Sequence, residues 1–148
     1  MSIVSDTSSI NYLILIGQID LLPALFKQIV IPEAVYDELS DSAAPQLVQD
    51  WISNIPCWLT VCSVTQPGEK IVDQLDPGEH AAILLAQQLS GDLILLDDMK
   101  ARRVAMGRGF AITGILGILD QIDLPDTVQN TSFWASDALF QKLLDRHL

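Results

Sequence analysis

The chain has 148 residues, of which 49% are hydrophobic, and its formal net charge is −11. This length suits one domain with a substantial core, and the acidic balance argues against broad, sequence-independent binding of nucleic acid over a large surface. No apolar run is long enough to span a bilayer, and the first residues lack the basic segment of a signal peptide, so we expect a cytoplasmic protein. Cys57 and Cys62 are too far apart for a CxxC motif and are expected to be small, unpaired apolar residues.

Short apolar runs alternate with amphipathic stretches along the chain. Strands are expected at residues 3–5, 28–31, 58–64, 93–96 and 110–112. Helices are expected at residues 10–16, 20–26, 33–39, 45–52, 67–75, 77–89, 99–105, 115–121 and 133–146. This order predicts a three-layer α/β/α sandwich around a central, mainly parallel five-stranded sheet. No linker or repeat divides the chain, so we expect one domain over residues 1–148, with an amphipathic helix at about 133–146 for packing or partner contact.

Two of the expected helices allow more detailed predictions. Asp20, the first residue of the helical segment expected at residues 20–26, is its candidate N-cap. In the helix at residues 45–52, the side chains expected to face inward are Leu47, Val48, Trp51 and Ile52.

The most informative stretch is a continuous apolar run, residues 93–96, that ends in two adjacent carboxylates, Asp97 and Asp98. A run that is apolar on both faces is typical of a strand buried inside a parallel sheet. Such a strand delivers its last residues to the carboxyl edge of the sheet, where open α/β folds bind ligands. Because neighbouring carboxylates repel each other, the pair favours a bound divalent cation.

Three more acids occupy comparable positions, and each has an ordinary structural explanation. Asp6 follows the strand at residues 3–5 and is equally well interpreted as a helix cap or as a metal ligand. Glu38 lies at the margin of an apolar helical stripe, where an acid is often only solvated. Glu79 has the spacing of a capping box with Asp76, which is slightly the stronger interpretation of that stretch alone.

Coincidence could explain the placement of any one of these acids, but it is a weaker explanation for all of them together. Carboxylate oxygens without a Cys or His cluster are typical ligands of Mg²⁺ or Mn²⁺. The segment directly after the acidic pair, residues 100–108, holds half of the eight basic residues, and they could pair with acids or hold a phosphate backbone: Lys100, Arg102, Arg103 and Arg108.

Five segments in order carry a resemblance to a known family. They are residues 4–8 (VSDTS), 31–39 (IPEAVYDEL), 75–82 (LDPGEHAA), 95–105 (LLDDMKARRVA) and 112–117 (ITGILG). The sequence resembles a PIN domain, and more closely the PIN-like family grouped with VapC-type toxins of prokaryotic toxin–antitoxin systems and with DUF3368-like nucleic-acid-binding PIN proteins. No single segment is specific, whereas the ordered set is.

The resemblance implies a metal-dependent endoribonuclease, a hydrolase in which water attacks an RNA phosphodiester in line. It implies Mg²⁺ or Mn²⁺ as cofactor, and RNA, a cognate antitoxin and a second copy of the chain as partners, with no membrane. The implied catalytic residues and metal ligands are Asp6, Glu38, Glu79 and Asp97, with Asp98 as the alternative or additional ligand. The implied substrate-contacting residues are Thr7, Arg102 and Arg103.

Other functions fit the sequence less well or only as alternatives. A catalytically weak or inactive PIN-like binding module remains open, because the chain is acidic and its basic patch is small. A receiver domain needs its acidic pair after the first strand, where this chain has only Asp6. A haloacid-dehalogenase-like phosphatase needs Asp-x-Asp there, which Asp6, Thr7 and Ser8 do not provide.

Overall fold

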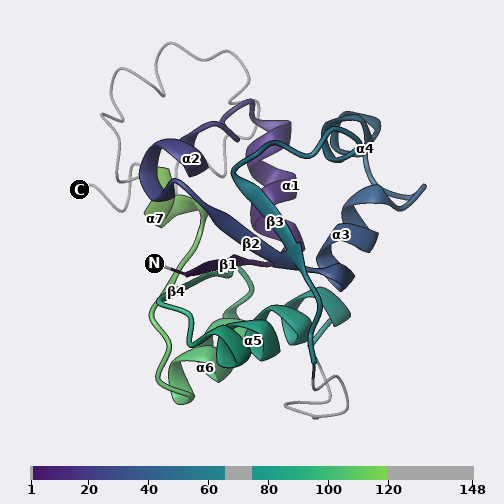
Figure 1. The fold of residues 1–148 in the computed structure, drawn as a ribbon. Helices are drawn as coiled ribbons and strands as arrows, with labels where there is room; N and C mark the ends of the chain where they lie inside the picture. Colours follow the sequence, from purple (N-terminus) through teal and green to yellow (C-terminus); the bar gives the residue numbers. More distant parts are fainter. Residues whose placement is uncertain (1, 66–74, 120–148) are drawn as a thin grey trace.

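The computed structural model describes residues 2–65 and 75–119 and contains a five-stranded sheet between two layers of helices (Figure 1). The spatial order of the strands is β3-β2-β1-β4-β5, and every neighbouring pair is parallel. The predicted fold class is confirmed. The strands are β1 (Ile3–Ser5), β2 (Ile29–Pro32), β3 (Leu59–Cys62), β4 (Leu93–Leu95) and β5 (Ile112–Thr113).

The helices cover both faces of the sheet. Those on one face are α1 (Thr7–Leu15), α2 (Leu21–Phe26), α3 (Glu33–Ser40), α4 (Gln46–Ile52) and α7 (Ile115–Leu119), and those on the other are α5 (Pro77–Leu89) and α6 (Met99–Gly107) (Figure 1). The predicted helix at residues 67–75 lies almost wholly outside the described residues, and that at 133–146 lies wholly outside them. The single-domain organisation therefore stays a prediction.

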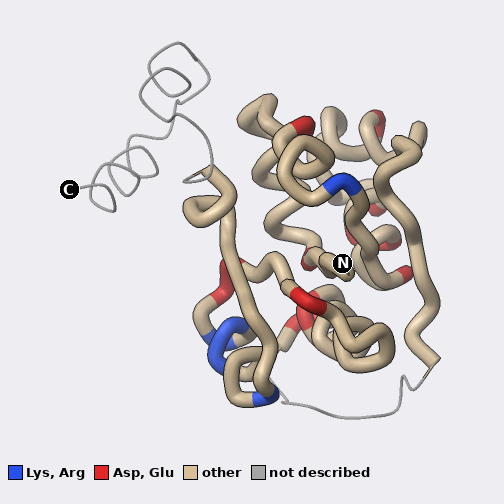
Figure 2. Tube along the Cα trace, turned by 60° about the vertical axis from the view of Figure 1, so that its left-hand side comes forward, with Lys and Arg blue, Asp and Glu red and all other residues tan. Residues whose placement is uncertain are grey.

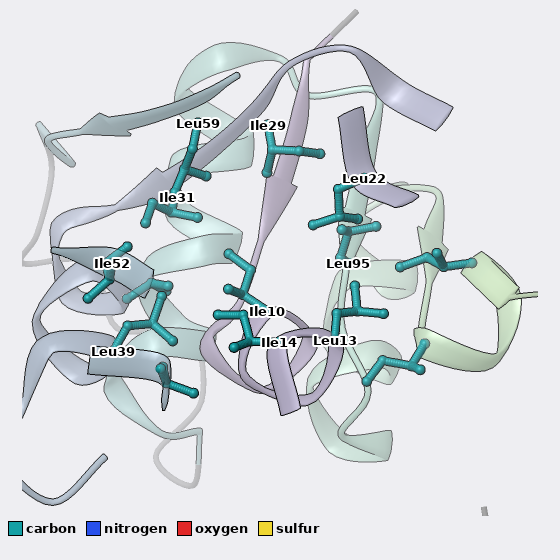
Figure 3. Packing of buried hydrophobic residues seen from close by; sticks show 14 of the residues in the cluster. Ile10, Leu13, Ile14, Leu22, Ile29, Ile31, Leu39, Ile52, Leu59 and Leu95 are labelled. Carbon is teal, nitrogen blue, oxygen red and sulfur yellow. The ribbon is translucent and has the colours of Figure 1, made fainter. Parts of the chain in front are cut away.

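Alternating strand residues separate two apolar cores. Ile3, Ile31 and Leu95 face the core beneath α1, whereas Val4 and Ile94 face the core beneath α5 and α6. Figure 3 shows the first core, in which residues of α1 pack against those of β2, β3 and β4. Because both faces are buried, the strands read as continuous apolar runs.

Three local predictions need correction. Helix α1 begins at Thr7 rather than at Ile10, because the Asp6 carboxylate accepts the backbone N–H of Ser9 at 3.0 Å and caps the first turn. Asp20 precedes α2 but makes no side-chain capping hydrogen bond. Leu47 is 56% exposed rather than inward, because the short helix α4 buries only a narrow stripe that includes Val48.

Two expectations from composition can be compared with the structure. Both cysteines are free thiols, with Cys62 half-buried as expected for a small apolar residue and Cys57 exposed. In the part of the chain that the structure describes, every helix is too short or too polar to cross a membrane.

Helix α1 provides a test of the first core, because Leu13 is fully buried and Leu15 is 43% exposed on the same helix. We predict that Leu13→Ala lowers the free energy of unfolding by about 2–5 kcal/mol, since it removes buried methyl groups and leaves a cavity. Leu15→Ala should change it by no more than about 0.5 kcal/mol. Urea denaturation measures both values, and equal losses would contradict the packing of α1.

Candidate functional site

The carboxyl edge of the sheet is the place where the predicted acids meet. Asp6 follows β1 directly, and its backbone N–H donates to the Leu95 carbonyl of β4 at 3.1 Å. Asp97 comes two residues after β4, and Glu38 lies in α3, which begins where β2 ends. Because β1 lies between β2 and β4, parallel topology brings these three positions to one edge.

Asp6 is the most deeply buried of these acids, with no solvent exposure. Its Oδ1 accepts the Ser9 N–H, whereas its Oδ2 is buried without a hydrogen-bond partner. Burial raises the pKa of Asp6 to about 7, and the negative charges of Asp97 and Glu79 contribute in the same direction. The helix-cap interpretation of Asp6 is therefore confirmed, and its second carboxylate oxygen has no hydrogen-bond partner, whereas metal binding by Asp6 stays a prediction.

Glu79 enters the site from the first turn of α5. It forms a capping box with Asp76: Asp76 Oδ1 accepts the Glu79 N–H at 2.8 Å, and Glu79 Oε1 accepts the Asp76 N–H at 3.2 Å. Burial raises the pKa of Glu79, with further increases from the charges of Asp76, Asp98 and Glu38. The capping-box interpretation of this stretch is therefore confirmed, and Glu79 also lies within the electrostatic influence of the other acids, whereas metal binding by Glu79 stays a prediction.

Glu38 is half-buried and approaches the same helix end from α3. Its Oε1 is buried without a hydrogen-bond partner, and so is the hydroxyl of Thr7. Burial and the charge of Asp76 raise the pKa of Glu38. Polar interactions with the Thr7 side chain and the Gly78 backbone partly offset this rise. A Cβ at position 78 would overlap Glu38 Oε1 and lie 2.7 Å from Thr7 Oγ1, so this approach requires glycine.

The two adjacent aspartates have different surroundings. Asp97 Oδ1 accepts the Ile115 N–H at 2.9 Å, and its Oδ2 accepts the Ser9 hydroxyl at 3.3 Å. Burial raises the pKa of Asp97, and the nearby Arg102 guanidinium partly offsets the rise. Asp98 is exposed and caps α6 by accepting the Ala101 N–H at 3.0 Å. Asp97 is therefore the member of the pair that joins Asp6.

Electrostatic coupling links the predicted acids into one group. Asp6 is coupled to Asp97 and Glu79, and Glu79 in turn to Glu38 and Asp98. Within residues 2–65 and 75–119, the buried side-chain oxygens and nitrogens without a hydrogen-bond partner all lie here: Asp6 Oδ2, Thr7 Oγ1 and Glu38 Oε1. Unpaired buried oxygens and raised carboxylate pKa values are what a cation would relieve.

The donor set fits a hard divalent cation in its chemistry, since it consists of carboxylate and hydroxyl oxygens. The described residues nevertheless contain no group of three Asp, Glu, His or Cys side chains arranged to hold a metal ion as they stand. Separate hydrogen bonds hold Asp97 against α7 and Glu79 against its own helix. The acids thus lie at one edge of the sheet and influence one another's pKa values, but they do not form a complete set of metal ligands.

Sequence reasoning named some neighbouring residues and missed others. Arg102 is half-buried beside Asp97, whereas Arg103 is exposed. In Figure 2 the basic positions of α6 gather in one region, close to acidic ones. Ser9 and Gly114 were missed: Ser9 contacts both Asp6 and Asp97, and a Cβ at Gly114 would overlap Asp97 Oδ1. Ser9 lies three residues after Asp6 and could have been found from that spacing, whereas Gly114 is distant from Asp97 in the sequence and no local pattern marks it.

An α/β sandwich with acids gathered at the carboxyl edge defines the class of protein, and comparison with known proteins gives the family. The family model DUF3368, described as a PIN domain, matches residues 2–147, so the chain belongs to this PIN-domain family. PIN domains are commonly nucleases that use divalent metal ions.

Solved structures support the same fold. A PilT N-terminus domain protein, SSO1118, from the hyperthermophilic archaeon Sulfolobus solfataricus P2 is similar with a TM-score of 0.61 and 18% identity, over 82% of this chain and 92% of that one. A comparison with curated proteins found no match.

Asp6 makes stability depend on pH. Its folded-state pKa of about 7 exceeds the ordinary value of 3.8, so the folded state binds the extra proton between these values and loses stability as pH rises through them. We predict that Asp6→Asn, which keeps an oxygen for the Ser9 N–H, raises the free energy of unfolding at pH 8 in EDTA, by at most about 4 kcal/mol, and flattens its decline between pH 4 and 8. Urea denaturation across pH measures this.

The control for this prediction is Asp20→Asn, because Asp20 is exposed and makes no side-chain capping hydrogen bond. Its pH dependence should match that of the wild type. An Asp6→Asn protein less stable than the wild type at pH 8 would contradict the assignment of Asp6 as a strained, buried carboxylate.

Gly78 offers a way to move Glu38 without removing a charge. An added methyl group would displace the flexible end of Glu38 and also press on the hydroxyl of Thr7, so Gly78→Ala should fold with a loss of unfolding free energy of about 1–3 kcal/mol. It should weaken Mn²⁺ binding, measured by titration calorimetry, about tenfold, since displacing Glu38 removes one anionic oxygen. Gly107→Ala in α6, with nothing near the added methyl group, should leave Mn²⁺ affinity unchanged. Equal Mn²⁺ affinities in the two variants would show that Glu38 does not bind the cation.

Proposed function

We propose that this protein is a metal-dependent endoribonuclease of the PIN type, which hydrolyses RNA phosphodiester bonds at the carboxyl edge of its sheet. The observation that carries the proposal is the gathering of buried, unpaired oxygens among carboxylates whose pKa values are raised. Such an arrangement costs folding free energy, and a cation offsets that cost. Family membership supports the same class of reaction.

The ligands would be Asp6, Glu38, Glu79 and Asp97. When bound, Mg²⁺ or Mn²⁺ would supply positive charge that stabilises the phosphodiester transition state and makes water a stronger nucleophile. Asp6 and Glu38 each have one buried carboxylate oxygen without a hydrogen-bond partner. Asp98 is less suited, because it is exposed and its carboxylate caps α6. Thr7, whose hydroxyl is unpaired beside Glu38, would orient that carboxylate or a water.

The chain's own residues would also position the substrate and move the proton. A carboxylate of the group would accept the proton of the attacking water, a role favoured by a raised pKa. Arg102 lies close enough to Asp97 to lower its pKa and could hold the phosphate of the cleaved bond. Arg103, which is exposed, would contact the strand farther along.

The biological setting is proposed from the family resemblance. The protein would act in the cytoplasm of a prokaryote as the toxin of a toxin–antitoxin pair, as a homodimer, with a cognate antitoxin blocking the acidic edge. The chain's net charge of −11 fits a basic antitoxin segment.

A second candidate is a catalytically weak or inactive PIN-like binding module. One observation favours it: the described residues hold no ready-made group of three metal-binding side chains. In that case the acids would serve as helix caps and as an interaction surface.

Cleavage of labelled single-stranded RNA with Mn²⁺ distinguishes these candidates. We predict cleavage by the wild type that EDTA abolishes, and at least about a hundredfold slower cleavage by Asp6→Asn, because the loss of one anionic ligand removes several kcal/mol of transition-state stabilisation. Asp20→Asn should cleave like the wild type. No Mn²⁺-dependent cleavage by the wild type, or equal cleavage by Asp6→Asn, would leave the binding module as the better candidate.

A further inference from the structure

A pocket of about 610 Å³ opens beside the acidic group. Helix α1 contributes Ser8 and Tyr12, which lie one turn apart on the same helix face, and α6 contributes Met99 and Arg102. The segment at residues 112–117, which includes the β5–α7 junction, lines the remainder. Asp97 also lines this pocket, so the cavity and the proposed metal site share one carboxylate.

The lining combines an aromatic ring, a flexible thioether and a cation. Tyr12 is 40% exposed and Met99 is 60% exposed, so large apolar groups are left in contact with water. Aromatic rings exposed in this way are the usual stacking platforms for unpaired bases, and Arg102 adds a group that pairs with phosphate. The volume is within the range of about 300–1,000 Å³ that small-ligand sites occupy.

We propose that this pocket binds the base of an unpaired nucleotide next to the bond that is cleaved, an inference that rests on the proposed ribonuclease function. The base stacks on Tyr12 with Met99 against it, and the attached phosphate lies toward Arg102 and Asp97. Ser8 supplies a polar contact at the base edge. A base paired in a duplex cannot enter such a pocket, so the protein selects single-stranded segments.

Charge favours RNA over a protein segment as the occupant. In the described ranges, every lysine and arginine except Lys27 lies within residues 100–108, which form α6 and the turn after it. The phosphate backbone of a nucleic acid is an anionic polymer that would meet both this basic helix and the proposed metal site. A stacked base then provides affinity that the acidic chain as a whole cannot provide through charge.

The test measures binding in EDTA, where metal-dependent cleavage does not interfere. The probes are a fluorescein-labelled chain of ten adenylates and a matching chain of ten abasic ribose phosphates, and the readout is fluorescence anisotropy. We expect the wild type to bind the adenylate chain at least about tenfold more tightly than the abasic chain, and Tyr12→Ala to lose about tenfold for the adenylate chain and less than about twofold for the abasic chain.

Matched variants separate stacking from folding. Leu15→Ala changes an apolar residue of α1 that has similar exposure and lies outside the pocket lining, so it should bind both chains like the wild type. Tyr12→Phe keeps the ring and should retain most of the preference. Met99→Glu, at an exposed position, should weaken binding of the adenylate chain at least about tenfold by placing a carboxylate in the pocket.

Two outcomes would overturn the inference: equal affinity of the wild type for the two chains, or equal binding by Tyr12→Ala and Leu15→Ala. Either would favour a partner polypeptide as the occupant of the pocket. The proposed function fails independently of this result. Base-dependent binding without Mn²⁺-dependent cleavage would contradict the ribonuclease function and support the base-binding pocket. Mn²⁺-dependent cleavage without base-dependent binding would support the ribonuclease function and contradict the pocket.

Discussion

The burial of several carboxylates at one edge, away from the water that would stabilise their charge, is the constraint on which the rest of this site depends. The parallel sheet brings Asp6 and Asp97 to one edge, and α3 and α5 add Glu38 and Glu79. Each burial raises the pKa of a group that water would otherwise keep ionised. The fold tolerates this because backbone N–H groups at helix starts donate to Asp6, Glu79 and Asp97. The acids that would hold a metal ion at this edge therefore lower the stability of the folded protein.

Much of the fold could be predicted from the sequence, because its physical causes are local. Continuous aliphatic runs predict buried parallel strands, and the Asp76-Pro77 pair with Glu79 predicts the start of α5, where the structure has a full capping box. Leu47 was misplaced because a seven-residue helix against one layer buries a narrow stripe, which hydrophobicity alone does not delimit. The start of α1 was placed late, at Ile10, because the apolar pattern of the helix begins there, whereas the Asp6 cap begins the helix at Thr7.

The candidate site could be predicted only in part. The sequence names the acids, since each follows a strand or opens a helix, but it leaves open whether Asp97 or Asp98 turns inward. That choice depends on Ile115 and Ser9, which are distant in sequence and donate to Asp97. The pocket at Tyr12 is likewise formed by elements far apart in the chain: the family segments at residues 95–105 and 112–117 contribute to its lining, but nothing in the sequence indicates that Tyr12 lies beside them. Tertiary contacts of this kind have no local signature.

The capping roles of these acids affect how the family's sequences can be interpreted. Asp98 caps α6, and Glu79 belongs to a capping box, so a relative that had lost all activity would still gain stability by keeping them. Glu38 caps no helix and has a buried oxygen without a partner. Across relatives, the identity of the residue at position 38, and with it the glycine at position 78, should therefore distinguish active nucleases from inactive relatives better than Asp98 or Glu79 does.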